Sequence, residues 1–225
     1  PDALAHLLTC LNEDALPLVP AMGTVGASGD LTPLAHITGA LMGEGWIRHN
    51  GREAEPAARV LERLGLEPLA PGGKDALALV NGTSAMTGIA ALNDRLADRA
   101  LRWSTLITVA HAQALNGRRE AWHQAFGQLR PHPGQQKLHR WLAVLDEAPP
   151  YPMTDEGQVA TDTLQQLNAP IQDPYSLRCA PQLLGAVADQ LDWHSQVVNT
   201  ELNSVTDNPI LPATLEQALH GGNFY

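Results

Sequence analysis

Residues 182–203, QLLGAVADQLDWHSQVVNTELN, decide the fold. Their apolar side chains and one histidine recur at alternating steps of three and four residues, at Leu184, Val187, Leu191, His194, Val198 and Leu202. This spacing places them on one face of a helix, in the pattern expected where long helices pack nearly antiparallel. The segment therefore predicts a long bundle helix that ends before Asp207-Asn208-Pro209.

A second long helix is predicted from Thr83 onward, with a helical composition that continues towards Phe126. Pro131, Pro133 and Gly134 then break the pattern. One face of this helix carries Ala85, Ile89, Leu92 and Leu96. We interpret the apolar faces of both long helices as bundle core rather than as a ligand site.

Shorter elements precede the bundle. Residues 2–12 show helical spacing, and Asp30 or Thr32 is placed to cap a helix that has Pro33 at its first position and runs to about residue 43. Residues 46–52 predict a hairpin because Asn-Gly favours a type I′ turn, and residues 56–65 predict a helix ended by Gly65. The fold class is therefore mainly α, a long-helix bundle with minor β-hairpins, divided into residues 1–80 and residues 81–225.

The composition excludes several classes of function. The 225 residues include 24 acidic and 14 basic ones, a net charge of −10, which argues against nucleic acid or an anionic membrane as a partner. No apolar run approaches the roughly 18 residues of a membrane span. Two cysteines are too few for a disulfide framework and favour a reducing cytoplasm. The nine histidines lack partners at ligand spacing, so we expect no metal site.

The segment from Gly23 to His36, GTVGASGDLTPLAH, has a chemistry of its own. Gly29 lacks a β-carbon, so its nitrogen can approach the carbonyl carbon of Ala27 and close a five-membered ring. Loss of water from the ring and of the Ser28 hydroxyl would leave an exocyclic methylidene, which is a strong electrophile. The alternative is a glycine-rich loop before a helix, and the tripeptide alone does not decide between them.

The sequence around this tripeptide resembles the aromatic amino acid ammonia-lyases and related aminomutases. In that family, Ala-Ser-Gly cyclises into 4-methylideneimidazol-5-one (MIO). The resemblance implies a long-helix bundle of the ammonia-lyase (fumarase/aspartase-like) type and a homotetramer whose active sites are shared between subunits. Six blocks carry it, in the family's order, at residues 26–36, 75–83, 129–135, 172–179, 201–209 and 221–224.

The resemblance implies roles for individual residues. MIO formed from Ala27, Ser28 and Gly29 would take the amino group of a small aromatic amino acid. Arg178 would hold the carboxylate, for which a planar guanidinium is suited, and Tyr175 would take part in proton transfer. The alternatives are a structural ion pair for Arg178 and a core tyrosine for Tyr175.

Four further positions match the family. Asn81 would lie near MIO and the substrate, although Asn before Gly is usually a turn residue. Gln172 would extend the polar strip of Tyr175 and Arg178; the alternative is a turn or cap residue. Phe224 would line the pocket for the aromatic ring of the substrate; the alternative is a core residue. Asp30 would help the cyclisation or simply cap a helix. We interpret Asn208, in the 201–209 block, as structural or supporting.

The function implied is a lyase that removes ammonia from an aromatic L-amino acid. The family's principal base, a tyrosine, and its ring-reading loop lie upstream of the region that this chain matches, so we expect an internal segment of a longer protein. Residues 80–88 and 201–203 are most similar to the bacterial tyrosine branch, and residues 172–179 are equally similar to the histidine branch. An aminomutase and a non-catalytic helical assembly module are the alternatives.

Overall fold

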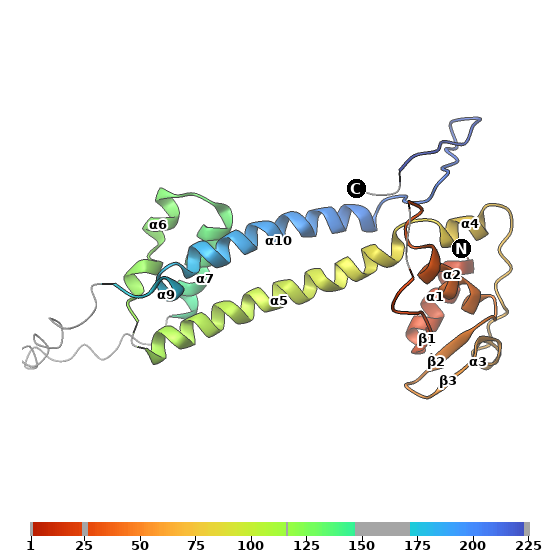
Figure 1. Cartoon of the computed structure of the whole chain (residues 1–225), viewed down its shortest axis with the longest axis horizontal. Coiled ribbons are helices and arrows are strands. Elements are labelled where there is room, and N and C mark those ends of the chain that lie inside the picture. The colour runs from red at the N-terminus through yellow and green to blue at the C-terminus, as the bar shows by residue number, and fades with distance from the viewer. Residues whose placement is uncertain (1, 24–26, 116, 147–171, 223–225) are drawn as a thin grey trace, which may run out of the picture. The chain divides into compact units, whose positions relative to one another are not determined.

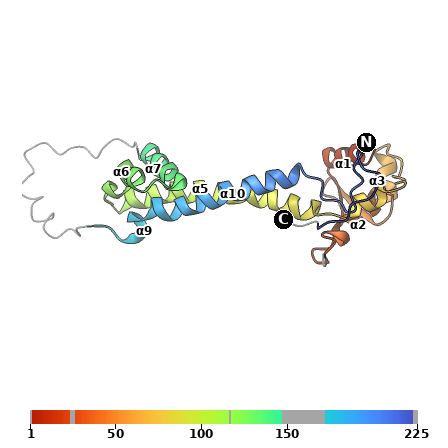
Figure 2. The same ribbon diagram turned by 90° about the horizontal axis from the view of Figure 1, so that it is seen from above.

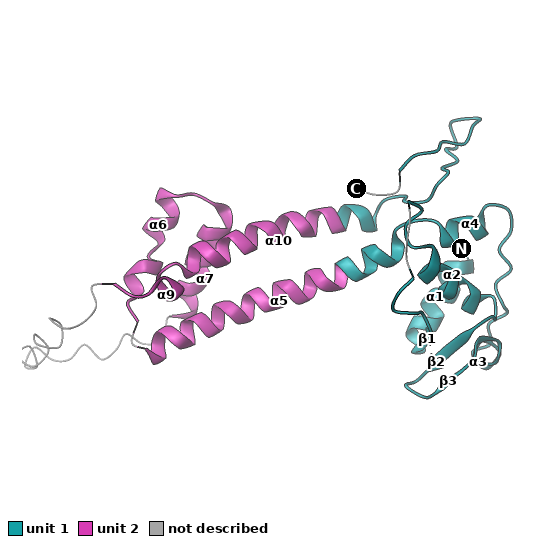
Figure 3. Ribbon diagram, in the orientation of Figure 1, with its two compact units in different colours: residues 1–90, 199–225 teal, residues 91–198 magenta. Residues whose placement is uncertain are grey.

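The computed structural model describes residues 2–23, 27–115, 117–146 and 172–222. They form two compact units, one of residues 1–90 and 199–225 and the other of residues 91–198 (Figure 3). Most of the chain is helical and the strands are short, which confirms the predicted fold class. Among the described residues, none of the helices is long and apolar enough to cross a membrane.

The first unit combines short helices with a small antiparallel sheet of strand order β1-β2-β3 (Figure 1). Asn50 and Gly51 connect β2 and β3 with φ angles of 52° and 68°, as the predicted type I′ turn requires. The core beneath the sheet includes the fully buried Ile47, Val60 and Leu61. The elements of this unit are α1 (Asp2–Asn12), β1 (Ala15–Pro17), α2 (Leu31–Leu41), β2 (Trp46–His49), β3 (Ala54–Pro56), α3 (Ala57–Arg63) and α4 (Asp75–Val80).

Two of the predicted short helices are confirmed, and the third begins earlier than expected. Residues 2–12 form α1, and Gly65, with φ of 67°, follows the end of α3. Helix α2 begins at Leu31, so Pro33 is its third residue instead of its first. A proline fits there because the first N–H groups of a helix have no partner within it.

Two long helices dominate the rest of the chain. In the views of Figures 1 and 2, α5 (Ser84–Ala114) and α10 (Ala180–Leu202) run alongside each other. Asp94 of α5 accepts hydrogen bonds at 2.7 and 2.8 Å from the Ser195 hydroxyl and lies 2.9 Å from Nδ1 of His194. The remaining elements are η1 (Arg119–Trp122), α6 (Gln124–Leu129), α7 (Pro133–Leu145) and α9 (Tyr175–Arg178).

The prediction of one long helix from Thr83 towards Phe126 was wrong at its C-terminal end. Helix α5 ends at Ala114, and the N–H of Gly117 then bonds to the Ala112 carbonyl at 2.7 Å. The helical composition beyond that point is used by two shorter elements, η1 and α6. Helix α7 was missed because Pro133 was interpreted as a break, whereas it occupies the first turn, where proline is tolerated.

The apolar faces of the long helices are only partly buried. Leu184 and Leu191 pack against a buried cluster that contains Leu138 and Leu101. The predicted face of α5, in contrast, is exposed by 60% at Ile89, 68% at Leu92 and 54% at Leu96. The interpretation of that face as core was therefore wrong within this chain, because no described segment covers it.

A pair of glycines sets the crossing of α7 and α10. A β-carbon on Gly134 would lie 2.0 Å from the carbonyl oxygen of Gly185. The N–H of Gly134 also donates to the Asp189 carboxylate at 2.6 Å. A carboxylate of α10 thereby caps α7, and the two backbones approach more closely than any side chain would permit.

Candidate active site

The segment Ala27–Gly29 is held by main-chain contacts in the first unit. Gly29 pairs with Gly82 as an isolated parallel bridge, and the N–H of Asp30 donates to the Gly82 carbonyl at 2.8 Å. Gly29 has φ of 83°, and a β-carbon there would lie 2.3 Å from that same carbonyl oxygen. Only glycine meets both conditions, so the chain turns tightly at the residue whose nitrogen would close the ring.

Asp30 links this segment to the long helix. It precedes α2 at the cap position, but its side chain does not cap that helix. Its carboxylate instead accepts a hydrogen bond at 2.6 Å from the N–H of Met86, in the first turn of α5. The expectation of a simple cap for its own helix was therefore wrong, because the buried carboxylate stabilises the positive end of α5.

Asn81 lies next to the same contact, between α4 and α5. Its side chain is buried, and Nδ2 donates to the main-chain carbonyl of Asn208. The Asn208 side chain accepts from the N–H of Gly221 at 3.0 Å, and the Thr206 hydroxyl accepts from the N–H of Thr83 at 3.4 Å. Residues from three separate blocks of the sequence thus meet at the start of α5.

Tyr175 and Arg178 form α9 in the second unit. The guanidinium carbon of Arg178 lies 4.2 Å from the centre of the Tyr175 ring, a cation–π contact. Tyr175 is 70% exposed, so it is not the core tyrosine of the alternative interpretation. None of the ion pairs among the described residues involves Arg178, and its buried Nε has no hydrogen-bond partner there.

Side chains near η1 fix the position of α9. Trp122 Nε1 donates to the Leu177 carbonyl at 2.9 Å, and the Asp173 carboxylate accepts from the N–H of Arg118 at 2.5 Å. Leu177 packs with Trp122 in a buried cluster. These contacts span 55 residues of sequence, so no local pattern indicated Trp122 or Asp173 as a supporting residue.

Two predicted residues do not join these groups. Gln172 is exposed and lies before α9 begins, so it does not share a helical turn with Tyr175 and Arg178. Phe224 lies outside the described residues. The roles proposed for both stay predictions.

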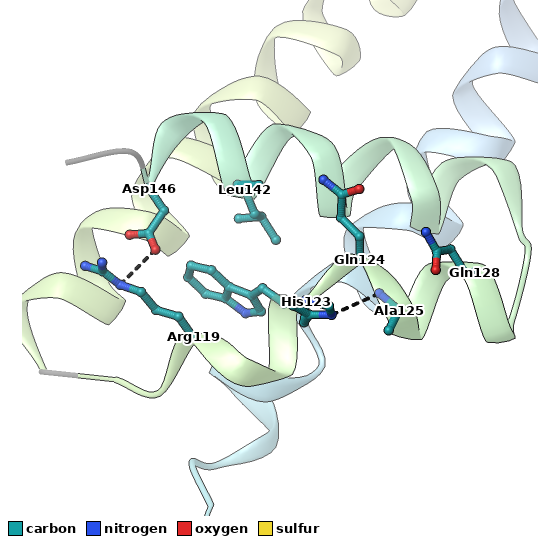
Figure 4. A pocket seen from close by; sticks show the side chains of 9 residues that line it. Arg119, His123, Gln124, Ala125, Gln128, Leu142 and Asp146 are labelled. Carbon is teal, nitrogen blue, oxygen red and sulfur yellow. Dashed lines mark hydrogen bonds and ion pairs between the residues drawn. The ribbon is translucent and has the colours of Figure 1, made fainter. Parts of the chain in front are cut away.

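Two cavities lie near these elements. One, of about 550 Å³, adjoins Asp30 in the first unit and is lined mainly by Val19–Gly23, Pro33, Ala85, Met86 and Ile89. The other, of about 450 Å³, lies in the second unit, where Arg119 pairs with Asp146 at 2.8 Å across it (Figure 4). His123, at its edge, accepts from the N–H of Ala125 and so caps α6. None of the predicted site residues lines this second cavity.

The residues at Ala27–Gly29 fit an MIO group. The order Ala-Ser-Gly supplies the carbonyl carbon, hydroxyl and nitrogen that cyclisation needs. The glycine approaches the Gly82 carbonyl more closely than any other residue would permit, and the neighbouring Asp30 is anchored to α5. In the part of the chain that the structure describes, no group of three or more His, Cys, Asp or Glu side chains is placed to hold a metal ion.

Similarity to known proteins extends over nearly the whole chain. The sequence profile of the family described as aromatic amino acid lyase matches residues 1–225. Tyrosine ammonia-lyase from Cereibacter sphaeroides is 45% identical over 98% of this chain and 43% of its own length. Histidine ammonia-lyase from Gloeobacter violaceus is 43% identical over 100% of this chain and 42% of its own. The chain thus spans less than half the length of these curated relatives.

The fold is shared with solved structures. The crystal structure of tyrosine aminomutase from Streptomyces globisporus superposes with a TM-score of 0.84 and 33% identity, over 98% of this chain and 43% of that one. The long-helix architecture is therefore the one found in this group of proteins.

Proposed function

The chain belongs to the aromatic amino acid lyase family, and on that premise we propose that the protein containing it eliminates ammonia from an aromatic L-amino acid to give a trans-arylacrylate. We propose tyrosine as the preferred substrate, because the tyrosine ammonia-lyase is 45% identical to this chain over the residues that align. The single observation that carries the proposal is the docking of Ala27–Gly29 against Gly82 through a glycine that no other residue can replace.

This chain would make its own cofactor. Ala27, Ser28 and Gly29 would form MIO, and Asp30 and Asn81 would hold the loop from its two sides. The group supplies an electrophilic carbon that makes the amine a better leaving group. The chain's other residues would bind and orient the substrate.

Arg178 would bind the substrate carboxylate. A guanidinium donates two parallel hydrogen bonds to a carboxylate, and this one is half-buried and stacked on an exposed phenol. The Tyr175 hydroxyl would exchange a proton near the bound amino acid. Asn81, Gln172 and Phe224 would complete the substrate contacts.

Two alternatives within the family are supported by particular relatives. Histidine ammonia-lyase from Gloeobacter violaceus is almost as similar as the tyrosine enzyme, which favours elimination from histidine to give urocanate as the second candidate. The likeness to a tyrosine aminomutase supports an enzyme that returns ammonia to the β-carbon. Incubation with tyrosine, phenylalanine and histidine, followed by chromatography, separates the three: a β-amino acid as the main product would contradict the lyase proposal.

The protein would act as a homotetramer with shared active sites. The exposed apolar face of α5, at Ile89, Leu92 and Leu96, supports an assembly because such a face is normally covered. A cytoplasmic location stays a prediction from the two cysteines. If the chain were only a non-catalytic assembly module, its intact mass would equal the mass encoded by the sequence, whereas MIO formation removes two water molecules.

A further inference from the structure

Thr83 carries a buried hydroxyl that has no hydrogen-bond partner among the residues that the structure describes. Its side chain is 0% exposed, and Oγ1 makes no hydrogen bond to any described residue. A second fully buried threonine behaves differently: the Thr105 hydroxyl, 1% exposed, donates to the Leu101 carbonyl at 2.8 Å. An unpaired buried hydroxyl is unfavourable, so its presence at Thr83 calls for a reason.

The side chain of Thr83 lies beside the segment that would cyclise. Its γ-methyl carbon is 3.4 Å from the position that a β-carbon on Gly29 would take. Thr83 directly follows Gly82, whose carbonyl accepts from Asp30 and whose backbone pairs with Gly29. The hydroxyl shares a β-carbon with that methyl group, so it belongs to the immediate surroundings of the loop.

Ring closure changes the polar groups of this loop. The Gly29 nitrogen bonds to the Ala27 carbonyl carbon, and its proton moves to the carbonyl oxygen. The resulting hydroxyl leaves with the Ser28 N–H proton as one water. Its departure leaves a C=N bond between the former Ala27 carbonyl carbon and the Ser28 nitrogen. The Ser28 hydroxyl then leaves with the Ser28 α-proton as the second water, which forms the exocyclic C=C bond, and no oxidant is needed.

We propose that the Thr83 hydroxyl is a positioning group for this cyclisation, unpaired in the uncyclised chain and hydrogen-bonded to the Ala27–Gly29 segment as the ring closes. The proposal rests on the proposed function, since it requires that MIO forms. A hydrogen bond made in the transition state and not before it lowers the barrier by its full value. Negative charge develops on the Ala27 oxygen during the attack, which strengthens a hydrogen bond donated to this segment.

Replacing the hydroxyl with a methyl group separates maturation from stability. Thr83→Val removes no hydrogen bond that the side chain makes to a described residue, so its melting temperature should be equal to or above that of the wild type. Loss of the two waters should be slowed about tenfold, the value of one hydrogen bond. The rate is measured by intact mass of the full chain over a time course of cell-free synthesis, and the melting temperature by circular dichroism.

Two further variants control this experiment. Thr83→Ser keeps the hydroxyl and should mature faster than Thr83→Val. Thr105→Val removes an equally buried but paired hydroxyl in the other unit and should mature at the wild-type rate.

The outcomes are distinct. Equal maturation rates of Thr83→Val and the wild type would overturn this inference and leave the proposed function intact. Slow maturation of Thr83→Val and Thr83→Ser alike, with lowered melting temperatures, would also overturn it, because packing would then explain the effect. A wild-type chain that loses no water would overturn both.

Discussion

Two short segments carry the proposed chemistry, and they are held in place in different ways. Ala27–Gly29, in the first unit, is fixed by main-chain contacts to Gly82. Tyr175–Arg178, in the second unit, is fixed by the side chains of Trp122 and Asp173. The first arrangement depends on side chains being absent, and the second depends on particular side chains being present. Substitutions should therefore disrupt them by opposite means, an added atom in one and a removed atom in the other.

The largest effect is expected at the main-chain contact. Gly29→Ala would place a β-carbon 2.3 Å from the Gly82 carbonyl oxygen, so we expect the loop to be displaced and both water loss and turnover to be abolished. Intact mass and product formation measure this. Gly45→Ala is the matched control, because Gly45 also has a positive φ, of 73°, but nothing lies within 4 Å of its added β-carbon. If Gly29→Ala still lost two waters, the close contact would not be needed.

The next largest effect concerns a second glycine contact, which extends the comparison into the second unit. Gly134→Ala would meet the Gly185 carbonyl at 2.0 Å and should lower the free energy of unfolding by about 3 kcal/mol. Urea denaturation measures the loss. Gly88→Ala, inside α5 with open space around it, should instead stabilise the protein by about 0.5–1 kcal/mol. Equal effects of the two substitutions would contradict the contact at the helix crossing.

Arg178 tests the chemistry of the side-chain arrangement. Arg178→Ala should lower kcat/KM on the order of a hundredfold, mainly through KM, because a charge-assisted pair of hydrogen bonds to the carboxylate is lost. Steady-state kinetics on the protein containing this chain measure it. Arg102→Ala, at an exposed arginine paired with Asp98, should leave both constants unchanged. A purely structural Arg178 would instead show a loss of stability with KM unaltered.

Trp122 tests how α9 is supported. Trp122→Phe keeps an aromatic ring in the buried cluster but removes the Nε1–H that bonds to the Leu177 carbonyl. We expect a loss of about 1 kcal/mol in unfolding free energy and a rise in KM, because the residue next to Leu177 is Arg178. Thermal unfolding and steady-state kinetics check this. An unchanged KM would show that the hydrogen bond from Trp122 does not contribute to substrate binding.

The smallest effect concerns pH. Hydrogen bonds from His194 and then Ser195 hold the pKa of the Asp94 carboxyl below its ordinary value. Because this pKa is lower in the folded state, the ionised carboxylate stabilises the fold at pH values above its ordinary pKa of about 4. That stabilisation is lost as the pH falls through the lowered pKa. Asp94→Asn should cost about 0.5 kcal/mol at pH 7 and less at pH 3. Melting temperatures measured from pH 3 to pH 7 test this, with Asp98→Asn, at an exposed carboxylate of the same helix, as the control. If the difference in melting temperature between Asp94→Asn and the wild type did not change with pH, the lowered pKa of Asp94 would be contradicted.

The two segments also differ in what the sequence predicts. Asn50-Gly51 is a local signal, and it predicted the hairpin. The missing β-carbon of Gly29 is likewise a local feature, and it indicated a close main-chain approach in the loop. The contacts of Trp122 and Asp173 join residues 55 positions apart, and nothing in a single sequence pairs them. Nothing in the sequence likewise pairs the Asp30 carboxylate with the N–H of Met86. The spacing of apolar residues on the exposed face of α5 indicates a buried face, but it does not identify what covers that face.

The central claim is that Ala27, Ser28 and Gly29 cyclise. Intact mass spectrometry of the wild-type chain and of Ser28→Ala tests it most directly. We predict that the wild type is lighter than its encoded mass by two water molecules. Ser28→Ala lacks the hydroxyl that leaves as the second water, so it should lose at most one water from its own encoded mass and be inactive. A wild-type chain at its full encoded mass would contradict the account.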